Sequence, residues 1–307
     1  MPTTRSPRRG SMQYWPRKRA KKHHARVRQH AKPIIFAGYK VGMTHAMFTD
    51  SRPNSNFKGM QVNWPVTVVE CPPLRIAGIA LYTKDDYGTH KAGQIIHPDK
   101  EFQRIQHAKN NGTLDNIKPE NYSSIRLIAQ TQPKLTAIGK KKPELFEITL
   151  KGTPQEQLET AKQKLGKEIT LKEALQAGAH LDTHAVTKGK GYAGPVKRFH
   201  VAIRQHKSEK TKRGIGTLGP WHGANMTKVA HAGQLGFQTR TERNKLLITI
   251  GHETEKINQK AGFARYGNVK NEYALFKGSL PGSIKRLIKF TQGTKKPEHI
   301  QLTWIKI

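Results

Sequence analysis

The stretch Gly189-Lys190-Gly191-Tyr192-Ala193-Gly194 has the spacing most suggestive of chemistry, because it matches G-x-G-x-x-G. In a dinucleotide site a helix opens at the third glycine, and an acidic residue about twenty positions on binds the ribose. Glu209 stands at that distance but lies inside a basic run, and Pro195-Val196-Lys197-Arg198 shows no apolar stripe of a helix. The motif therefore favours a backbone nest that, with Lys188 and Lys190, receives phosphate.

Other reactive side chains form no catalytic or metal-binding pattern. Among the 15 histidines, His23-His24, His200 and His206 lack the i, i+4 spacing or nearby cysteines of a metal site. Cys71 is the single cysteine, which excludes an internal disulfide and a cysteine-based zinc site. Asp85-Asp86 precedes Tyr87-Gly88 and is typical of a turn. We expect no enzyme activity, no metal and no cofactor.

Charge is the strongest signal in this chain of 307 residues. It holds 55 Lys and Arg against 21 Asp and Glu, a formal +34, and its first acidic residue is Asp50. Residues 85–182 hold 15 basic and 13 acidic residues, so the rest carries 40 basic against 8 acidic residues. Such a chain repels itself unless a polyanion neutralises it, which predicts a nucleic-acid partner. The histidines near the basic runs are then further contacts to it.

Membrane binding and secretion are not expected. The sequence has no run of about 18 apolar residues, and its charge is spread over far more chain than one juxtamembrane patch. The basic N-terminus has no apolar run behind it, so it is not a secretory signal. A reduced, cytoplasmic setting follows from these features and from the single cysteine.

The elements that must position the basic residues are mostly strands. Residues 1–32 lack apolar periodicity and are typical of an arm that stays disordered until a partner binds. Apolar and β-branched runs predict strands at 34–38, 62–69, 76–82, 183–187, 245–250, 273–277 and 301–307. We therefore expect a β-rich domain in two halves, residues 33–84 and 183–307.

The neutral segment, residues 85–182, contains predicted helices as well as strands. Thr153-Pro154-Gln155-Glu156 is a capping box with proline at the first helical position, and Gly166 ends the predicted helix. Thr170-Leu171-Lys172-Glu173 repeats the device, with Gly178 as terminator. Runs at 124–129 and 145–150 are typical of strands. The segment is predicted to be a small α/β module inserted into the β-rich domain.

Residues 195–243 form a long loop with little apolar pattern of either period. The loop combines many glycines and cations with Trp221 and Phe237, whose rings can stack on bases. So long a loop does not suit a free-standing compact domain, whereas an RNA partner could order it. The residues expected to contact RNA are Arg8, Arg9, Arg17, Lys18, Arg19, Lys40, Lys188, Lys190, Lys197, Arg198, Arg204, Lys207, Lys210, Lys212, Arg213, Lys228, Arg240 and Arg243.

Blocks along nearly the whole chain carry a family signature, so that the sequence resembles the universal large-subunit ribosomal protein three family in its archaeal and eukaryotic form. Only about residues 90–165 fall outside them. The blocks are Pro7 to Ser11, Pro16 to Ala20, Ala37 to His45, Glu70 to Leu74, Val186 to Gly191, Gly219 to His222, Ala232 to Gly236, Arg240-Thr241, Gly267 to Asn271 and Lys277 to Gly282.

The resemblance implies a mostly β fold with an α+β insert, namely a translation-protein-type β-barrel interrupted by the small α/β module. It further implies an early-assembling structural protein of the large ribosomal subunit in the cytoplasm. Its partners would be large-subunit rRNA, into which arm and loop thread, and neighbouring ribosomal proteins. The loop's tip near the peptidyl transferase centre would be Pro220, Trp221 and His222, with Trp221 stacking or wedging while RNA performs the catalysis.

Some features depart from the eukaryotic relatives. They carry a histidine, a methylation target, where this chain has Lys212 before Arg213-Gly214, so that modification is not predicted. The loop beyond Trp221 is slightly shortened, and the chain ends soon after Trp304, as in archaeal members. Two other classes stay open: a basic chromatin protein, which would prefer DNA, and an RNA-modifying enzyme, which would turn over rRNA.

Overall fold

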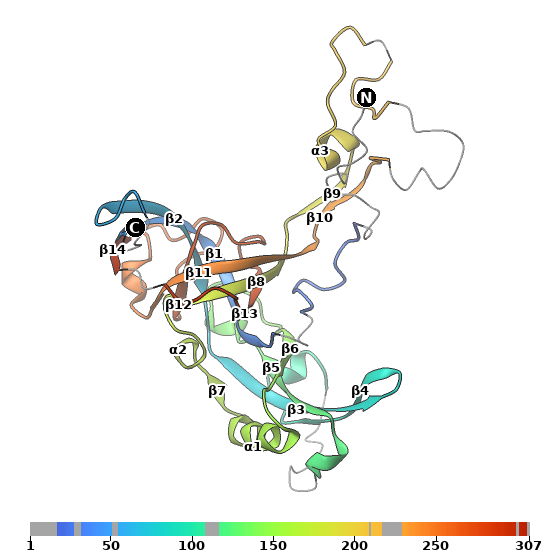
Figure 1. Cartoon of the computed structure of the whole chain (residues 1–307), viewed down its shortest axis with the longest axis vertical. Helices are drawn as coiled ribbons and strands as arrows, with labels where there is room; N and C mark the ends of the chain where they lie inside the picture. The colour runs from blue at the N-terminus through green and yellow to red at the C-terminus, as the bar shows by residue number, and fades with distance from the viewer. Residues whose placement is uncertain are drawn as a thin grey trace. The chain divides into compact units, whose positions relative to one another are not determined.

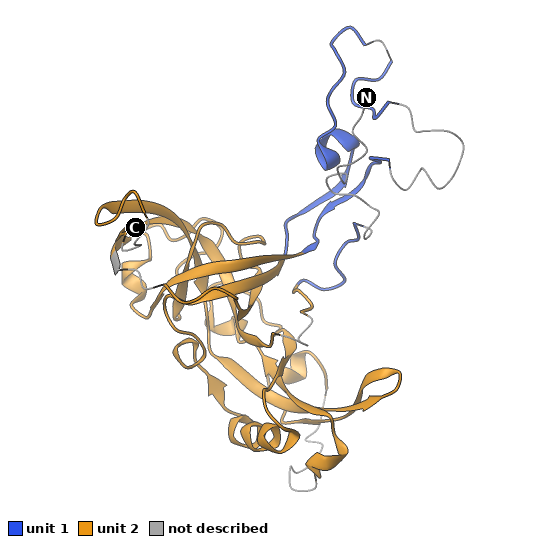
Figure 2. Ribbon diagram, viewed as in Figure 1, with its two compact units in different colours: residues 1–23, 186–239 blue, residues 24–185, 240–307 orange. Residues whose placement is uncertain are grey.

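The protein divides into two compact units in a computed structural model that describes residues 17–27, 32–50, 55–107, 117–208, 210–216, 229–298 and 301–305. Unit 1 comprises residues 1–23 and 186–239, and unit 2 comprises residues 24–185 and 240–307 (Figure 2). The fold is mostly β, as the sequence predicts.

The first sheet has seven strands within the described residues, in the order β13-β8-β11-β12-β2-β1-β14 (Figure 1). Because β13 also pairs with β1, the pairing path returns to its first strand and six strands form a closed ring. The strands are β1 (Ile34–Thr49), β2 (Gln61–Glu70), β8 (His180–Val186), β11 (Thr239–Gly251), β12 (Tyr273–Lys277), β13 (Leu287–Gln292) and β14 (Gln301–Ile305).

Most of these strands were predicted from their β-branched and apolar runs. β1 is much longer than the predicted 34–38, because it pairs first with β13 and then with β14 along one edge and with β2 along the other. Its Gly38 is required by close packing, since a Cβ there would lie 2.6 Å from the Cys71 sulfur. β13 was not predicted, although it closes the ring.

A second sheet pairs β4-β3-β5-β6, with β7 also on β3. Its strands are β3 (Leu74–Asp85), β4 (Gly88–Ile96), β5 (Ser124–Gln130), β6 (Leu145–Thr149) and β7 (Glu168–Ile169). The predicted turn at Asp85-Asp86 is confirmed, because residues 86–87 connect β3 to β4 as a hairpin. The strand pairing thus places β3 in the second sheet, whereas the predicted module begins only at residue 85.

Both predicted capping boxes are present. In α1 (Pro154–Lys164) Thr153 accepts from the Glu156 amide while the Glu156 carboxylate accepts from the Thr153 amide. In α2 (Leu171–Ala174) Thr170 and Glu173 form the same box, and the helix ends well before the predicted terminator at Gly178. Each box satisfies amides that have no partner inside the helix, which fixes where the helix starts.

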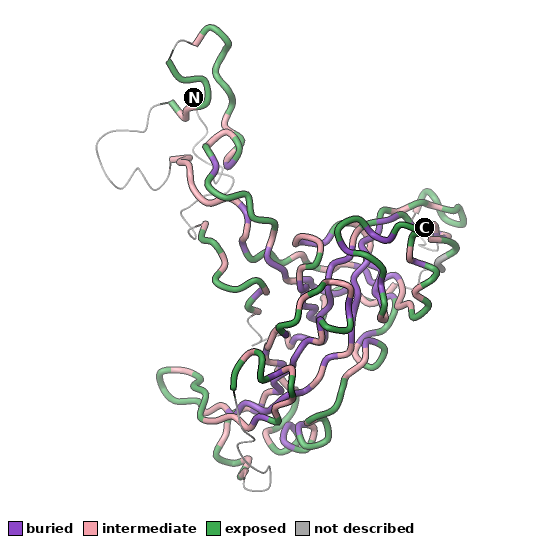
Figure 3. Tube along the Cα trace, turned by 180° about the vertical axis from the view of Figure 1, so that it is seen from behind, coloured by how far each residue is buried: buried purple, intermediate pink, exposed green. Residues whose placement is uncertain are grey.

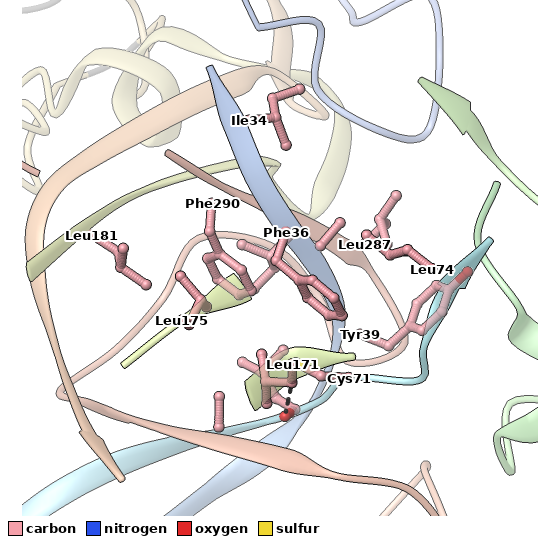
Figure 4. Close-up of a cluster of buried hydrophobic side chains, with 14 of the residues drawn as sticks. Ile34, Phe36, Tyr39, Cys71, Leu74, Leu171, Leu175, Leu181, Leu287 and Phe290 are labelled. Carbon is pink, nitrogen blue, oxygen red and sulfur yellow. Dashed lines mark hydrogen bonds between the residues drawn. The ribbon is translucent and has the colours of Figure 1, made fainter. Parts of the chain in front are cut away.

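One continuous core joins both sheets of unit 2 (Figure 4). Figure 4 shows Phe36 and Tyr39 of β1 beside Leu171, which α2 contributes, and Phe290 of the ring-closing strand. The Tyr39 hydroxyl also reaches the segment after β5, with its oxygen 2.8 Å from the Glu144 carboxylate. Burial and that carboxylate raise the pKa of Tyr39 well above its usual value, so the hydroxyl remains a donor.

Within the described residues, no helix has the length and apolar character needed to cross a membrane.

Candidate nucleic-acid interface

A two-stranded antiparallel ribbon forms the framework of unit 1. β9 (Gly189–Ala193) pairs with β10 (Gly233–Gly236), and the amide of Phe237 donates to the Lys188 carbonyl at 3.0 Å. At Gly236, with φ of 70°, a Cβ would lie 2.0 Å from the Lys188 carbonyl oxygen, so only glycine fits there. The G-x-G-x-x-G motif therefore lies in an antiparallel ribbon rather than between the parallel strands of a nucleotide fold.

A short helix corrects one expectation about this motif. α3 (Pro195–Phe199) does begin after Gly194, where the lack of an apolar stripe predicted none. Proline at the first helical position presets its backbone. The helix has five residues, and its one buried side chain is basic rather than apolar.

That side chain is Arg198, which is only 8% exposed. Its Nε donates to the Gln234 carbonyl at 3.2 Å and its Nη1 donates to the His231 carbonyl at 2.8 Å. Gly233 lies beneath the guanidinium, because a Cβ there would approach Nη1 to 2.7 Å. Arg198, predicted to contact RNA, is therefore a structural clamp that ties α3 to β10. We call this junction, where the segment between the two elements leaves and re-enters the ribbon, the root of the loop.

Part of the arm packs on the same root. The Ala20 amide donates to the Phe237 carbonyl at 2.8 Å, and Arg17 lies over the Phe199 ring with Cζ 4.5 Å from its centroid. Phe237, predicted to be a base-stacking residue, has its ring 5.6 Å from the His23 ring in an edge-on contact. Cation–π and backbone contacts thus order residues 17–23, although this segment shows no apolar periodicity.

The segment from 201 to 216 has no regular secondary structure in its described positions, as expected. The Arg204 amide donates to the Lys212 carbonyl at 3.1 Å, which brings two distant points of the segment together. Most of its described residues are exposed and none of them is buried (Figure 3). The cations of the segment are therefore presented to solvent.

Most of the predicted RNA contacts that fall on described residues have exposed side chains. They are Lys18, Arg19, Lys188, Lys190, Lys197, Arg204, Lys207, Lys210, Lys212, Arg213, Arg240 and Arg243. All but the last two lie in unit 1, and Arg240 and Arg243 lie on β11 in unit 2.

Unit 1 has almost no negative charge to offset these cations. Its sequence holds 18 Lys and Arg and one acidic residue, Glu209, so that it carries +17, half of the chain's formal +34. Glu209 lies outside the described residues. No described residue of unit 1 therefore offers a carboxylate to the exposed cations, which leaves them for an external anion.

Lys40 differs from this group. It is 9% exposed, and its ammonium donates to the Leu280 carbonyl at 2.6 Å and to the Gly282 carbonyl at 3.5 Å. These carbonyls belong to the segment between β12 and β13. The Lys40 ammonium is thus hydrogen-bonded inside unit 2, and its contact with phosphate stays a prediction that this geometry does not favour.

Several predicted residues lie outside the described part of the chain. They are Arg8, Arg9, Lys228 and the predicted loop tip, Pro220, Trp221 and His222.

Of the histidines, His200 and His206 are exposed, and the described residues contain no group of three or more metal-ligating His, Cys, Asp or Glu side chains. Tyr192, which is 81% exposed, was not among the residues predicted from the sequence to contact RNA. Its position inside the basic G-x-G-x-x-G motif could have indicated it.

Comparison with known proteins gives consistent matches over nearly the whole chain. Residues 1–110 and 97–305 match the family model described as Ribosomal protein L3. A "Large ribosomal subunit protein uL3" from Methanosphaera stadtmanae is 42% identical, covering 94% of this chain and 92% of the relative. Proteins of the same name from Archaeoglobus fulgidus and Thermoplasma acidophilum are each 41% identical, covering 95% and 100% of this chain and 93% and 98% of the relatives.

Proposed function

The chain belongs to the ribosomal protein L3 family, and from this premise we propose that it is a structural constituent of the large ribosomal subunit. It binds large-subunit rRNA, of the 23S type, in the cytoplasmic ribosome and contacts neighbouring ribosomal proteins. The archaeal source of the relatives supports the archaeal type. The role is structural, with no catalysis by the protein, in agreement with the family.

The observation that carries this proposal is the charge of unit 1. Half of the formal net charge is concentrated in residues 1–23 and 186–239, where most of the described cations are exposed and no described residue carries a carboxylate. Phosphates along RNA are the polyanion that such a surface suits, because each cation placed on a phosphate releases a condensed counterion. In unit 2, Arg240 and Arg243 on β11 are also exposed cations.

In this role the closed ring of strands is a translation-protein-type β-barrel and serves as a rigid platform. The sequence predicts residues 85–182 as the inserted module between the barrel halves 33–84 and 183–307, with residues 1–32 as the basic arm; we extend this module to include β3. The closed pairing of six strands supports the barrel, while the pairing of β3 supports an insert that begins at Leu74 rather than at 85. Residues 85–182 of the insert hold 15 basic and 13 acidic residues, so they have little net charge to attract RNA and suit solvent or protein neighbours.

Pro220, Trp221 and His222 would form the tip of the long loop near the peptidyl transferase centre. There Trp221 would hold RNA geometry by stacking, and the arm and loop would let phosphate-dense helices pack closely during early subunit assembly. Support for this part comes from the family match across residues 97–305.

Sedimentation of a tagged copy in cell lysate tests the proposal against a chromatin protein. We expect co-migration with large subunits through moderate salt, lost after RNase treatment and unaffected by DNase. Migration as a free protein, or release by DNase alone, would overturn the ribosomal role and favour the DNA-binding alternative.

A further inference from the structure

Tyr192 is an exposed aromatic residue on the ribbon of unit 1. It lies on β9 and is 81% exposed, although tyrosine carries a large apolar ring that proteins usually cover at least in part. Within the described residues, its ring and hydroxyl take part in no hydrogen bond, ion pair or ring contact. The protein thus presents an aromatic ring that nothing described in unit 1 uses.

The backbone around Tyr192 is shaped by a bulge. Gln234 pairs with Tyr192, and Gly236 pairs with Gly189, so Lys190 and Gly191 together oppose one residue of β10. Gly191 has φ of 65°, a conformation that favours glycine. Bulges of this kind turn the following side chains away from the regular alternation of the strand. The orientation of Tyr192 is therefore set by the ribbon itself.

The cross-strand neighbour does not cover the ring. Gln234, which faces Tyr192 in the pairing, donates from Nε2 to the Leu235 carbonyl at 3.2 Å and to the Gly236 carbonyl at 3.0 Å. Its amide is thus held on its own strand. Lys188 and Lys190, both exposed, supply positive charge on the same strand segment.

We propose that Tyr192 is a stacking site for an unpaired RNA base, with Lys188 and Lys190 on the flanking phosphates. This inference rests on the proposed rRNA binding and names the kind of contact made by the ribbon. Bases splayed from loops and bulges of RNA stack on exposed aromatic rings, and a tyrosine flanked by cations combines that face with phosphate attraction. A phosphate contact alone would need no aromatic ring.

Tyr87 provides a matched control. It is 97% exposed at the β3–β4 turn, but it follows Asp85 and Asp86, whose carboxylates repel phosphate. Exposure alone therefore does not distinguish the two tyrosines. If stacking depends on the basic surroundings, only Tyr192 of these two tyrosines should stack on an RNA base.

The test compares wild type, Tyr192→Ala, Tyr192→Phe and Tyr87→Ala for binding to purified large-subunit rRNA over a salt series. We expect Tyr192→Ala to weaken binding roughly 5- to 100-fold, as loss of one stacked base does, without changing the slope of affinity against salt. Tyr192→Phe and Tyr87→Ala should bind as wild type. Ultraviolet crosslinking of the wild-type complex should place a nucleotide adduct on Tyr192.

The outcomes separate this inference from the function on which it rests. Steep salt-dependent binding by wild type, matched by Tyr192→Ala, would reject the stacking site and leave rRNA binding intact. The stacking site would also be rejected if Tyr192→Ala binds RNA normally but fails to enter subunits, since the ring would then serve a protein neighbour. Wild type that shows no salt-dependent rRNA binding would remove the proposed function as well.

Discussion

The Nη1 of Arg198 donates to the main-chain carbonyl of His231 at 2.8 Å, joining α3 to the segment just before β10. A guanidinium that is 8% exposed is thus used inside the protein, in a unit whose other cations mostly face solvent. Removing it would leave the carbonyls of His231 and Gln234 without their donor.

Arg198→Met should destabilise the junction between α3 and the β9–β10 ribbon while unit 2 stays folded. Hydrogen bonds to a charged group contribute about 1.5–3 kcal/mol each, so protection of the β9–β10 amides should fall by about that much. Hydrogen exchange followed by mass spectrometry measures the change. Lys197→Met, on the same helix but exposed, is the control. Equal protection in the two variants would show that Arg198 is not a clamp.

Glu70 is a second buried charge with a structural role. Its carboxylate is fully buried and accepts hydrogen bonds from the Tyr266 hydroxyl and from the amides of Lys270 and Asn271, each amide within 3.0 Å. Burial and this carboxylate raise the pKa of Tyr266 far above its usual value, so the phenol remains a donor. Glu70 therefore fixes the segment after residue 263 against β2.

Glu70→Gln should lower the free energy of unfolding by about 2–4 kcal/mol, because an amide offers donors where the site supplies donors already. Chemical denaturation of the two proteins measures this difference. Glu159→Gln, an exposed change on α1, should stay within about 0.5 kcal/mol of wild type. A Glu70→Gln protein as stable as the control would contradict the assigned role.

His184 predicts a pH dependence of stability. Its ring nitrogens lie 2.8 Å from the Thr241 hydroxyl and 3.0 Å from the Thr291 hydroxyl. Burial lowers the pKa of His184, and Lys289 and Lys32 lower it further against the opposing effect of Asp182.

Because the folded pKa lies below the unfolded value near 6.5, the unfolded chain binds the proton more readily. Above that value His184 adds no pH dependence, and as pH falls below it the folded state loses stability until the folded pKa is passed. Unfolding free energies measured from pH 8 to 5 should fall less steeply in His184→Gln than in wild type. His90→Gln, an exposed change on β4, should follow wild type. Parallel curves for His184→Gln and wild type would rule out this group.

The strands and caps that could be predicted have local signals. β2 carries the β-branched run Val66-Thr67-Val68-Val69, and the two capping boxes fix the starts of α1 and α2. β13 lacked such a signal because Lys289 lies in its middle. That lysine is 2% exposed, with its ammonium 4.6 Å from the centroid of the Phe146 ring, so only the tertiary structure makes this residue acceptable in a closing strand.

The positive charge of the candidate site could be predicted from the sequence. Which cations face solvent and which are hydrogen-bonded inside the protein could not. In a chain this basic, every lysine or arginine resembles a phosphate contact, and only the folded carbonyls around Lys40 and Arg198 assign those two inward. The ribbon was missed because β9 reads Gly-Lys-Gly-Tyr-Ala, which has little intrinsic strand preference and depends on pairing with β10.

The salt dependence of rRNA binding tests most directly whether the exposed cations of unit 1 form the interface. Contact with about ten phosphates predicts a slope of log affinity against log salt near −7 to −9 for wild type. Changing Lys207, Lys210, Lys212 and Arg213 together to Gln should reduce its magnitude by about 3 to 4. The same number of changes on the insert, at Lys141, Lys142, Lys162 and Lys164, should leave it unchanged. Equal slopes for the two variants would contradict the assignment of RNA binding to unit 1.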